Sequence, residues 1–184
     1  GTLDMTCKAT GRIYRDLHFF EDRGECGGPW HSGIIPGDNP LTTRKCRATV
    51  RTVEDSEWVA VREISLNFRL PADITPDEKK RSARCVNLPI RTRVILKKDS
   101  PMLEFETWID NTAKSHRLRV MFPSGLSRAA TAEAEGQFDV VSRPIIPIDK
   151  SDYDVPGGDF LPGTRHTPLS THPQVSFMDI SDGR

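Results

Sequence analysis

Two stretches of strictly alternating residues, 103–109 and 118–122, constrain this sequence more than any other feature. In the first stretch, one side carries Leu103, Phe105, Thr107 and Ile109, and the other carries Glu104, Glu106 and Trp108. A period of two residues is the signature of a strand with one buried face. The residues between the stretches, 110–115, are polar and rich in turn formers. The pattern therefore predicts an antiparallel hairpin at the centre of a sheet.

The remaining apolar pattern predicts further strands and no long helix. We expect strands over residues 2–9, 13–20, 44–54, 57–70, 85–98, 137–143 and 175–180. Pro89 suggests that its strand lies at an edge or contains a bulge. The charged segment 71–84 has no apolar stripe, so we expect a solvated crossing loop or one helical turn, with Lys79, Lys80 and Arg81 at a wet surface.

The fold class that follows is all-β, an antiparallel β-sandwich. A sandwich is favoured over a closed barrel because the predicted strands are long and unevenly spaced. We predict a single domain over residues 1–184. Residues 151–173, which are rich in Pro and Gly, are predicted to form a long irregular loop within it.

Charge and hydropathy exclude several classes of partner. The chain has 26 basic and 26 acidic residues, a net charge of zero, which argues against nucleic acid and anionic membranes. No apolar run approaches the roughly 20 residues of a membrane-spanning helix. The sequence opens on strand-like residues without a secretory leader, so we expect a piece of a longer protein that lies in the cytoplasm.

The cysteines and histidines do not form a recognisable metal or redox motif. Cys7, Cys26, Cys46 and Cys85 are widely spaced and include no Cys-x-x-Cys pair, so neither a zinc knuckle nor a redox motif is expected, while the spacing leaves a disulfide open. We expect Cys46 and Cys85 on apolar strand faces, as small hydrophobic side chains. No histidine stands at ligand spacing from another histidine or a carboxylate.

Two pairs of carboxylates have the residue types that a glycosidase needs, one acid and one nucleophile or base. They are Glu21 with Asp22, and Glu104 with Glu106. Glu104 and Glu106 share a strand face and lie ~7 Å apart along it. Alternating charges are also the ordinary composition of the wet face of a hairpin. The residues alone thus predict a β-domain without a catalytic centre.

Four short stretches resemble the C-terminal β-domain of glycoside hydrolase family 38. They are Thr10–Asp22 with its Thr-Gly-Arg and Phe-Glu-Asp segments, Arg117–Gly125, Gln137–Pro144, and His172-Pro173-Gln174 before Phe177 and Asp179. The matches occur in the family's order and extend from Leu3 to Gly183. The family comprises α-mannosidases, and its bacterial branch includes mannosylglycerate hydrolases.

The resemblance implies a fold related to galactose mutarotase, a large sandwich of twisted antiparallel sheets. It also implies that the zinc site and the nucleophile lie in an N-terminal catalytic domain outside these residues. We therefore assign no catalytic residue, metal ligand or cofactor to this chain. Its expected partners are that catalytic domain and, through it, a carbohydrate substrate. Because strands of the sandwich would be missing, we expect this chain alone to self-associate.

One departure from the family concerns the loop after Phe20-Glu21-Asp22. Bacterial relatives tend to carry an acidic residue and a tyrosine there, whereas this chain has Gly28, Pro29, Trp30 and His31. Gly28 allows close backbone approach, Trp30 offers a ring face to a sugar, and His31 offers hydrogen bonds. These three are the candidate carbohydrate-facing residues, although Trp30 alternatively pins the loop to the sandwich. The alternative function is a stand-alone carbohydrate-binding sandwich without hydrolase activity.

Overall fold

The computed structural model describes residues 1–27, 33, 35, 37–145 and 175–181. The chain forms two compact units, Gly1–Pro123 and Ser124–Arg184. Apart from one 3-10 turn, every regular element in the described ranges is a β-strand, and every strand pair is antiparallel, so the all-β prediction is confirmed. The prediction of a single domain over residues 1–184 stays a prediction.

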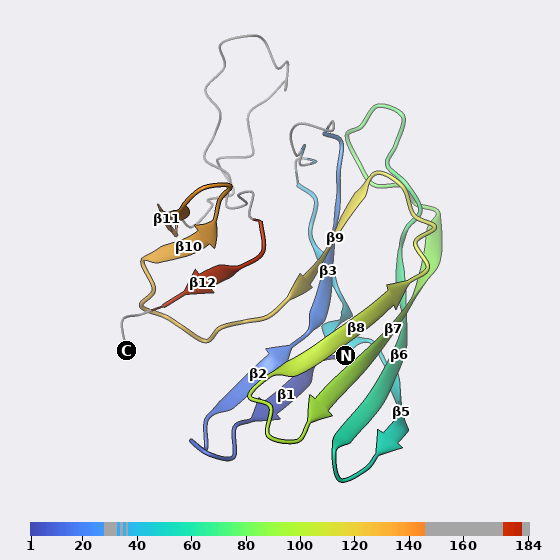
Figure 1. The fold of residues 1–184 in the computed structure, drawn as a ribbon. Helices are drawn as coiled ribbons and strands as arrows, with labels where there is room; N and C mark the ends of the chain where they lie inside the picture. Colours follow the sequence, from blue (N-terminus) through green and yellow to red (C-terminus); the bar gives the residue numbers. More distant parts are fainter. Residues whose placement is uncertain (28–32, 34, 36, 146–174, 182–184) are drawn as a thin grey trace. The chain divides into compact units, whose positions relative to one another are not determined.

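In its described residues, the first unit contains nine strands and the 3-10 turn. A four-stranded sheet has the order β5-β6-β7-β8, a three-stranded sheet has the order β4-β3-β9, and β1 and β2 form a hairpin (Figure 1). The elements are β1 (Leu3–Thr6), β2 (Ile13–Leu17), β3 (Phe19–Gly24), β4 (Leu41–Thr42), η1 (Thr43–Lys45), β5 (Ala48–Asp55), β6 (Val59–Pro71), β7 (Cys85–Lys97), β8 (Leu103–Ile109) and β9 (His116–Met121).

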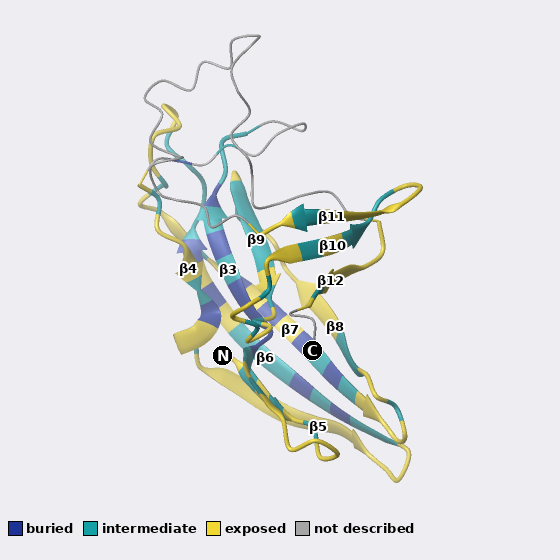
Figure 2. Ribbon diagram, turned by 90° about the vertical axis from the view of Figure 1, so that its left-hand side faces the viewer, coloured by how far each residue is buried: buried dark blue, intermediate teal, exposed yellow. Residues whose placement is uncertain are grey.

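The two larger sheets of this unit enclose an apolar core, which makes the unit a β-sandwich. Phe20 comes from β3, Phe68 and Leu70 from β6, and Leu88 and Ile90 from β7, and all five side chains are buried together. Leu118 of β9 packs against them. Buried residues alternate with exposed ones along β6 and β7, as expected for strands with one buried face (Figure 2).

The register predicted from the alternation of residues 103–109 is confirmed. Phe105 lies on the inner face of β8, where its ring stacks on that of His18 at 4.6 Å between centroids. Thr107, two residues further, bonds to Thr92 on the neighbouring strand at 3.0 Å. Trp108 lies on the opposite face and is 42% exposed.

The predicted hairpin between residues 103–109 and 116–122 is wrong. β8 pairs with β7, and β9 pairs with β3 in the other sheet. The connection 110–115 crosses between the sheets, and its backbone bonds to both sides: the Lys114 N–H donates to the Ala72 carbonyl at 2.9 Å, and the Ser115 carbonyl accepts from the Glu25 N–H at 2.9 Å. Crossing lets the apolar faces of both strands contribute to one core.

Pro89 lies in the central strand β7, not in an edge strand, and the structure explains why it is tolerated. Its carbonyl accepts from the Asp110 N–H at 3.1 Å, just beyond the end of β8. In an antiparallel strand the N–H and C=O of one residue point to the same neighbour. The missing donor therefore faces the place where β8 ends, and no bond to β6 is lost.

The cysteines are free thiols in the structure. Cys46 packs against the apolar core, as predicted. Cys85 is exposed, contrary to the prediction, because the inward residues of β7 are the even-numbered ones from Val86 onward.

The second unit contains a three-stranded sheet of order β11-β10-β12, formed by β10 (Thr131–Glu135), β11 (Val140–Pro144) and β12 (Met178–Ile180). The last two lie in segments predicted to be strands. β10 was not predicted, because alternating alanine and glutamate carry little strand propensity. The loop predicted over 151–173 lies outside the described residues.

One buried carboxylate on the outer face of the four-stranded sheet was not predicted. The side chain of Glu63 is only 7% exposed and lies between two arginines. Arg51 Nη2 donates to Oε1 at 2.7 Å, and Arg93 Nε donates to Oε2 at 3.2 Å. These bonds, that of Arg51 first, hold the pKa of the Glu63 carboxyl below its usual range.

This ion-pair network predicts a specific dependence of stability on pH. A carboxyl whose pKa is lower in the folded state adds stability above its unfolded pKa, about 4.3, and that stability is lost as the pH falls through the folded value. Glu63→Gln should therefore lower the melting temperature near pH 7, and its difference from the wild type should shrink as the pH falls below about 4. Glu57→Gln is the control, because Glu57 pairs with Lys98 at the exposed surface. A difference that is constant from neutral to acidic pH would contradict the prediction.

Candidate functional site

The predicted carbohydrate-facing residues Gly28, Trp30 and His31 lie outside the described residues. The structure does describe both ends of the loop that carries them. Glu25, Cys26 and Gly27 lead out of β3, and Gly33 and Ile35 lead back toward β4.

Glu25 closes the base of the loop. Its Oε1 atom accepts from the Gly27 N–H at 2.8 Å and from the Gly33 N–H. The Cys26 N–H also donates to the Gly33 carbonyl at 2.9 Å. Two of these hydrogen bonds, from the Gly33 N–H to Glu25 and from the Cys26 N–H to the Gly33 carbonyl, tie the two described ends of the loop together and fix its base.

Two glycines are required by this packing. A Cβ atom on Gly33 would lie 2.4 Å from the Gly27 backbone nitrogen and 2.8 Å from the Cys26 carbonyl carbon. A Cβ atom on Gly24 would lie 2.5 Å from Cδ1 of Ile35, whose side chain is almost wholly buried. Any side chain at either position would force the base apart.

A buried polar cluster lies at the end of β3 from which this loop departs. Asp22 is fully buried, and its carboxylate accepts from Arg81 Nη2 at one oxygen and from His116 Nδ1, at 2.5 Å, at the other. The side chains of Arg81 and His116 are themselves only 9% and 5% exposed. The three residues join β3, the segment 71–84 and β9, so the cluster fixes the loop base to the sandwich.

The orientation of His116 is set from both sides of its ring. The Ala113 N–H donates to Oδ1 of Asn111 at 3.2 Å, which identifies that atom as the oxygen. His116 Nε2 lies 3.0 Å from the same oxygen, while Nδ1 faces the Asp22 carboxylate. Contacts at both ring nitrogens hold His116 in one orientation.

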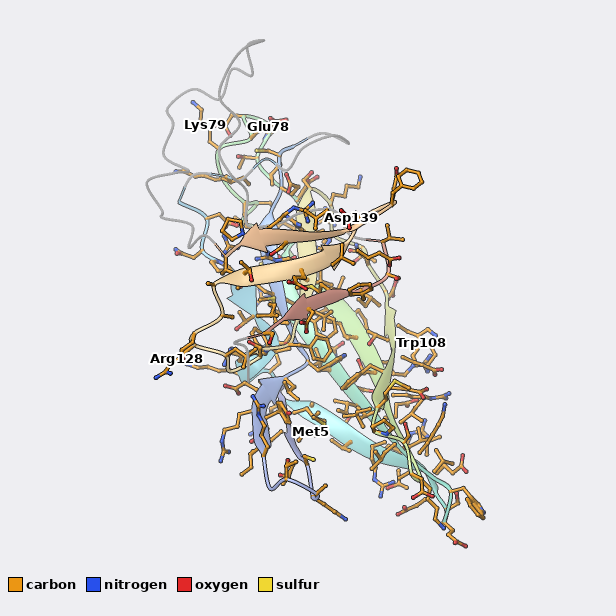
Figure 3. The ribbon with its side chains drawn as sticks, turned by 60° about the vertical axis from the view of Figure 1, so that its left-hand side comes forward. Met5, Glu78, Lys79, Trp108, Arg128 and Asp139 are labelled. Carbon is orange, nitrogen blue, oxygen red and sulfur yellow. The ribbon has the colours of Figure 1, made fainter. Side chains whose placement is uncertain are left out.

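Arg81 corrects the prediction that the run Lys79-Lys80-Arg81 lies at a wet surface. Glu78 and Lys79 do lie at the tip of segment 71–84 (Figure 3). The chain then returns, and a bridge between Ile74 and Arg81 turns the arginine inward. Its Nη1 atom is buried and has no hydrogen-bond partner in the described part of the chain.

Three of the carboxylates considered above as acid or base, Glu21, Asp22 and Glu104, bind basic side chains. Glu21 binds Arg119 and, at 3.3 Å, Arg23, whereas the neighbouring Asp22 points to the opposite face of β3. Glu104 binds Lys97 at 2.7 Å on the outer face of the sheet. Glu21 and Asp22 therefore do not converge on a common space, as a glycosidase would require, and Glu104 is neutralised by Lys97.

The described residues also contain no group of three or more His, Cys, Asp or Glu side chains that could hold a metal ion. His18 is a core residue, stacked on Phe105, and burial lowers the pKa of its ring. His166 and His172 lie outside the described residues. Within the same ranges, no helix is long and apolar enough to cross a membrane.

Comparison with known proteins places the chain in a family. Residues 2–184 match the glycosyl hydrolases family 38 C-terminal domain, and the chain belongs to this family. A curated relative from Halalkalibacterium halodurans, named "Putative mannosylglycerate hydrolase", is 30% identical and is matched over 82% of this chain and 18% of its own length.

Two solved structures from Enterococcus faecalis have the same fold. One, an alpha-mannosidase from strain V583, superposes with a TM-score of 0.75 and 31% identity over 82% of this chain and 18% of its own. The other, a protein in glycosyl hydrolase family 38, gives a TM-score of 0.73 and 31% identity over 78% of this chain and 19% of its own. This chain thus spans less than a fifth of the length of the relatives it matches.

Proposed function

We propose that this chain is the C-terminal β-domain of a longer retaining α-mannosidase and contributes the loop 24–33 to the wall of its carbohydrate site. The domain supplies shape and binding contacts, while the reacting groups belong to the rest of the protein. Family membership and the named activity of the related Enterococcus protein support this proposal.

The observation that carries the proposal is the construction beneath the loop. A fully buried carboxylate held by an arginine and a histidine is costly to desolvate, and sandwiches are stable without such clusters. Here the cluster holds one end of a glycine-dependent loop in a fixed position. Precise placement of a loop is what a substrate-binding wall needs, because small displacements reduce rates strongly.

The zinc ion that the family resemblance implies has no place among the described residues of this chain. No group of three potential ligands is present in them, and Asp22 and Glu21 are engaged in ion pairs with Arg81 and Arg119. We accordingly assign the metal and the nucleophile to the remainder of the longer protein, and its location to the bacterial cytoplasm.

A direct test compares this chain with the longer protein that contains it. The longer protein should hydrolyse an aryl α-mannoside, and this chain alone should not, with or without added zinc, because binding without reacting groups contributes little rate. Turnover by the purified chain that disappears on mutating Glu104 or Glu106 would refute the proposal. Glycan binding by this chain combined with an inactive longer protein would favour a stand-alone binding module.

The role of the loop is tested in the longer protein with Trp30→Ala. If the ring contacts the sugar, kcat/KM should fall at least about tenfold while the melting temperature changes little. Trp58→Ala is the matched control, since Trp58 is an exposed tryptophan of β-hairpin 48–71. A lower melting temperature with unchanged kinetics would mean that Trp30 only fixes the loop to the sandwich.

A further inference from the structure

A groove lined by both polar and apolar groups lies on the outer face of the four-stranded sheet, the face turned away from the core. The register aligns Thr49, Ser65, Arg91 and Trp108 in one row across β5, β6, β7 and β8. Asn67 and Asp110 belong to the next row, on either side of Pro89. Side chains of both rows, with Arg47, line a groove of about 840 Å³.

The groove follows from the sizes of the side chains. Thr49, Ser65 and Asn67 are short and form the floor over β5 and β6. At one end stands the ion-pair network of Glu63 with Arg51 and Arg93. Since neighbouring rows of a strand face are only ~7 Å apart, the network forms a fixed wall beside the short residues.

The other wall is an aromatic platform. Trp108 lies on β8 (Figure 3). The guanidinium groups of Arg91 and Arg93 lie 4.7 Å and 5.2 Å from its ring centroid. These contacts hold the indole in place. The ring nevertheless remains 42% exposed, so an apolar surface is available to a ligand.

Polar groups around the platform are available as well. Within the described residues, no hydrogen bond or ion pair engages the side chains of Ser65 or Asn67, nor those of Arg47 and Asp110. The groove therefore combines a fixed aromatic surface with neutral donors and acceptors and with charges of both signs. It is a mixed set rather than the basic surface that a polyanion would require.

We propose that this groove binds a pyranose unit of a neutral glycan. The apolar face of the sugar ring stacks on Trp108, and its hydroxyl groups exchange hydrogen bonds with Ser65 and Asn67. At the edges of the sugar ring, Arg91 donates to a hydroxyl oxygen and the Asp110 carboxylate accepts from a hydroxyl group. The site is separate from the loop 24–33, which joins β3 and β4 of the other sheet.

Titration of this chain with α-linked mannotriose and with cellotriose, followed by NMR, tests the proposal. At least one trisaccharide should bind with a dissociation constant of ~1 mM or lower, and Trp108→Ala and Asn67→Ala should each weaken binding at least about tenfold. Trp58→Ala is the matched control and should leave binding unchanged, because its ring lies under Lys98 in the β5–β6 hairpin region, away from the groove lining. Asn67→Asp, which keeps the size of the side chain, should bind more weakly than the wild type.

Three outcomes would overturn the proposal. The first is that neither sugar binds at about 10 mM. The second is that binding is lost in Trp30→Ala and kept in Trp108→Ala, because the binding site would then belong to the loop 24–33. If Trp108→Ala lowers the melting temperature of the longer protein without changing the glycan titration, the face is an interface between domains and the proposal fails.

Discussion

Replacing Asp22 with alanine is expected to destabilise the first unit by about 3–5 kcal/mol, the cost of removing one partner from a buried ion pair. The substitution leaves Arg81 and His116 buried without their acceptor. Arg81 is the more costly of the two, because its Nη1 atom already has no hydrogen-bond partner among the described residues. Chemical denaturation of this chain measures the loss as a lower midpoint at unchanged slope.

Two variants distinguish this effect from the loss of any surface charge. Asp4→Ala removes a carboxylate that binds Arg15 at 3.3 Å at the exposed surface, and it should cost no more than about 1 kcal/mol. Adding Arg81→Met to Asp22→Ala should restore part of the stability, since the unpaired buried charge is then removed. A loss below about 1 kcal/mol in Asp22→Ala would mean that water replaces the carboxylate and that the cluster does not hold the loop base.

The alternating pattern predicted burial correctly but not strand pairing. Leu103 and Phe105 do face the core, yet the strand that contains them pairs with β7 and not with β9. A period of two residues reports which side of a strand is buried, and both a hairpin and a crossing between two sheets satisfy it. The strand pairings, together with the backbone bonds of residues 110–115 to Pro89, Ala72 and Glu25, distinguish the two arrangements.

The polar cluster could not be predicted because its members are far apart in the sequence. Asp22 lies 59 positions from Arg81 and 94 from His116. Asp22 follows Glu21, and the two were interpreted as a candidate acid and base. Arg81 ends a charged run that is mostly exposed, and His116 has no ligand-spaced neighbour. What could be predicted is the loop itself, from its glycines and from its place after Phe20-Glu21-Asp22.

Glu63 illustrates a third limit of the sequence pattern. It alternates with apolar residues, as a residue on a wet face should, and it does lie on the outer face. Its burial arises from the two arginines of the neighbouring strands, which cover it. Cross-strand partners thus decide whether a charged residue on an outer face is solvated or belongs to a fixed wall.

Replacing Gly33 with alanine in the longer protein is expected to lower kcat/KM toward an aryl α-mannoside by about a hundredfold. The new Cβ atom would lie 2.4 Å from the Gly27 nitrogen, and backbone atoms cannot move aside as a flexible side chain can. The loop base must open, which breaks the bonds that Glu25 and Cys26 make to Gly33. The core lies in the strands of the sandwich, so the melting temperature should fall by only a few degrees.

Variants of Glu25 separate loop position from other effects of the Gly33 substitution. Glu25→Ala removes the acceptor that closes the base and should lower kcat/KM to a similar extent, whereas Glu25→Gln keeps an oxygen for the Gly27 and Gly33 N–H groups and should remain near the wild type. If Gly33→Ala and Glu25→Ala both retain wild-type kinetics, the loop does not line the carbohydrate site. If Glu25→Gln is as damaging as Glu25→Ala, the negative charge matters rather than the closure of the loop. The expected order, with Gly33→Ala and Glu25→Ala impaired and Glu25→Gln active, would show that the β-domain acts on the substrate through the fixed position of this one loop.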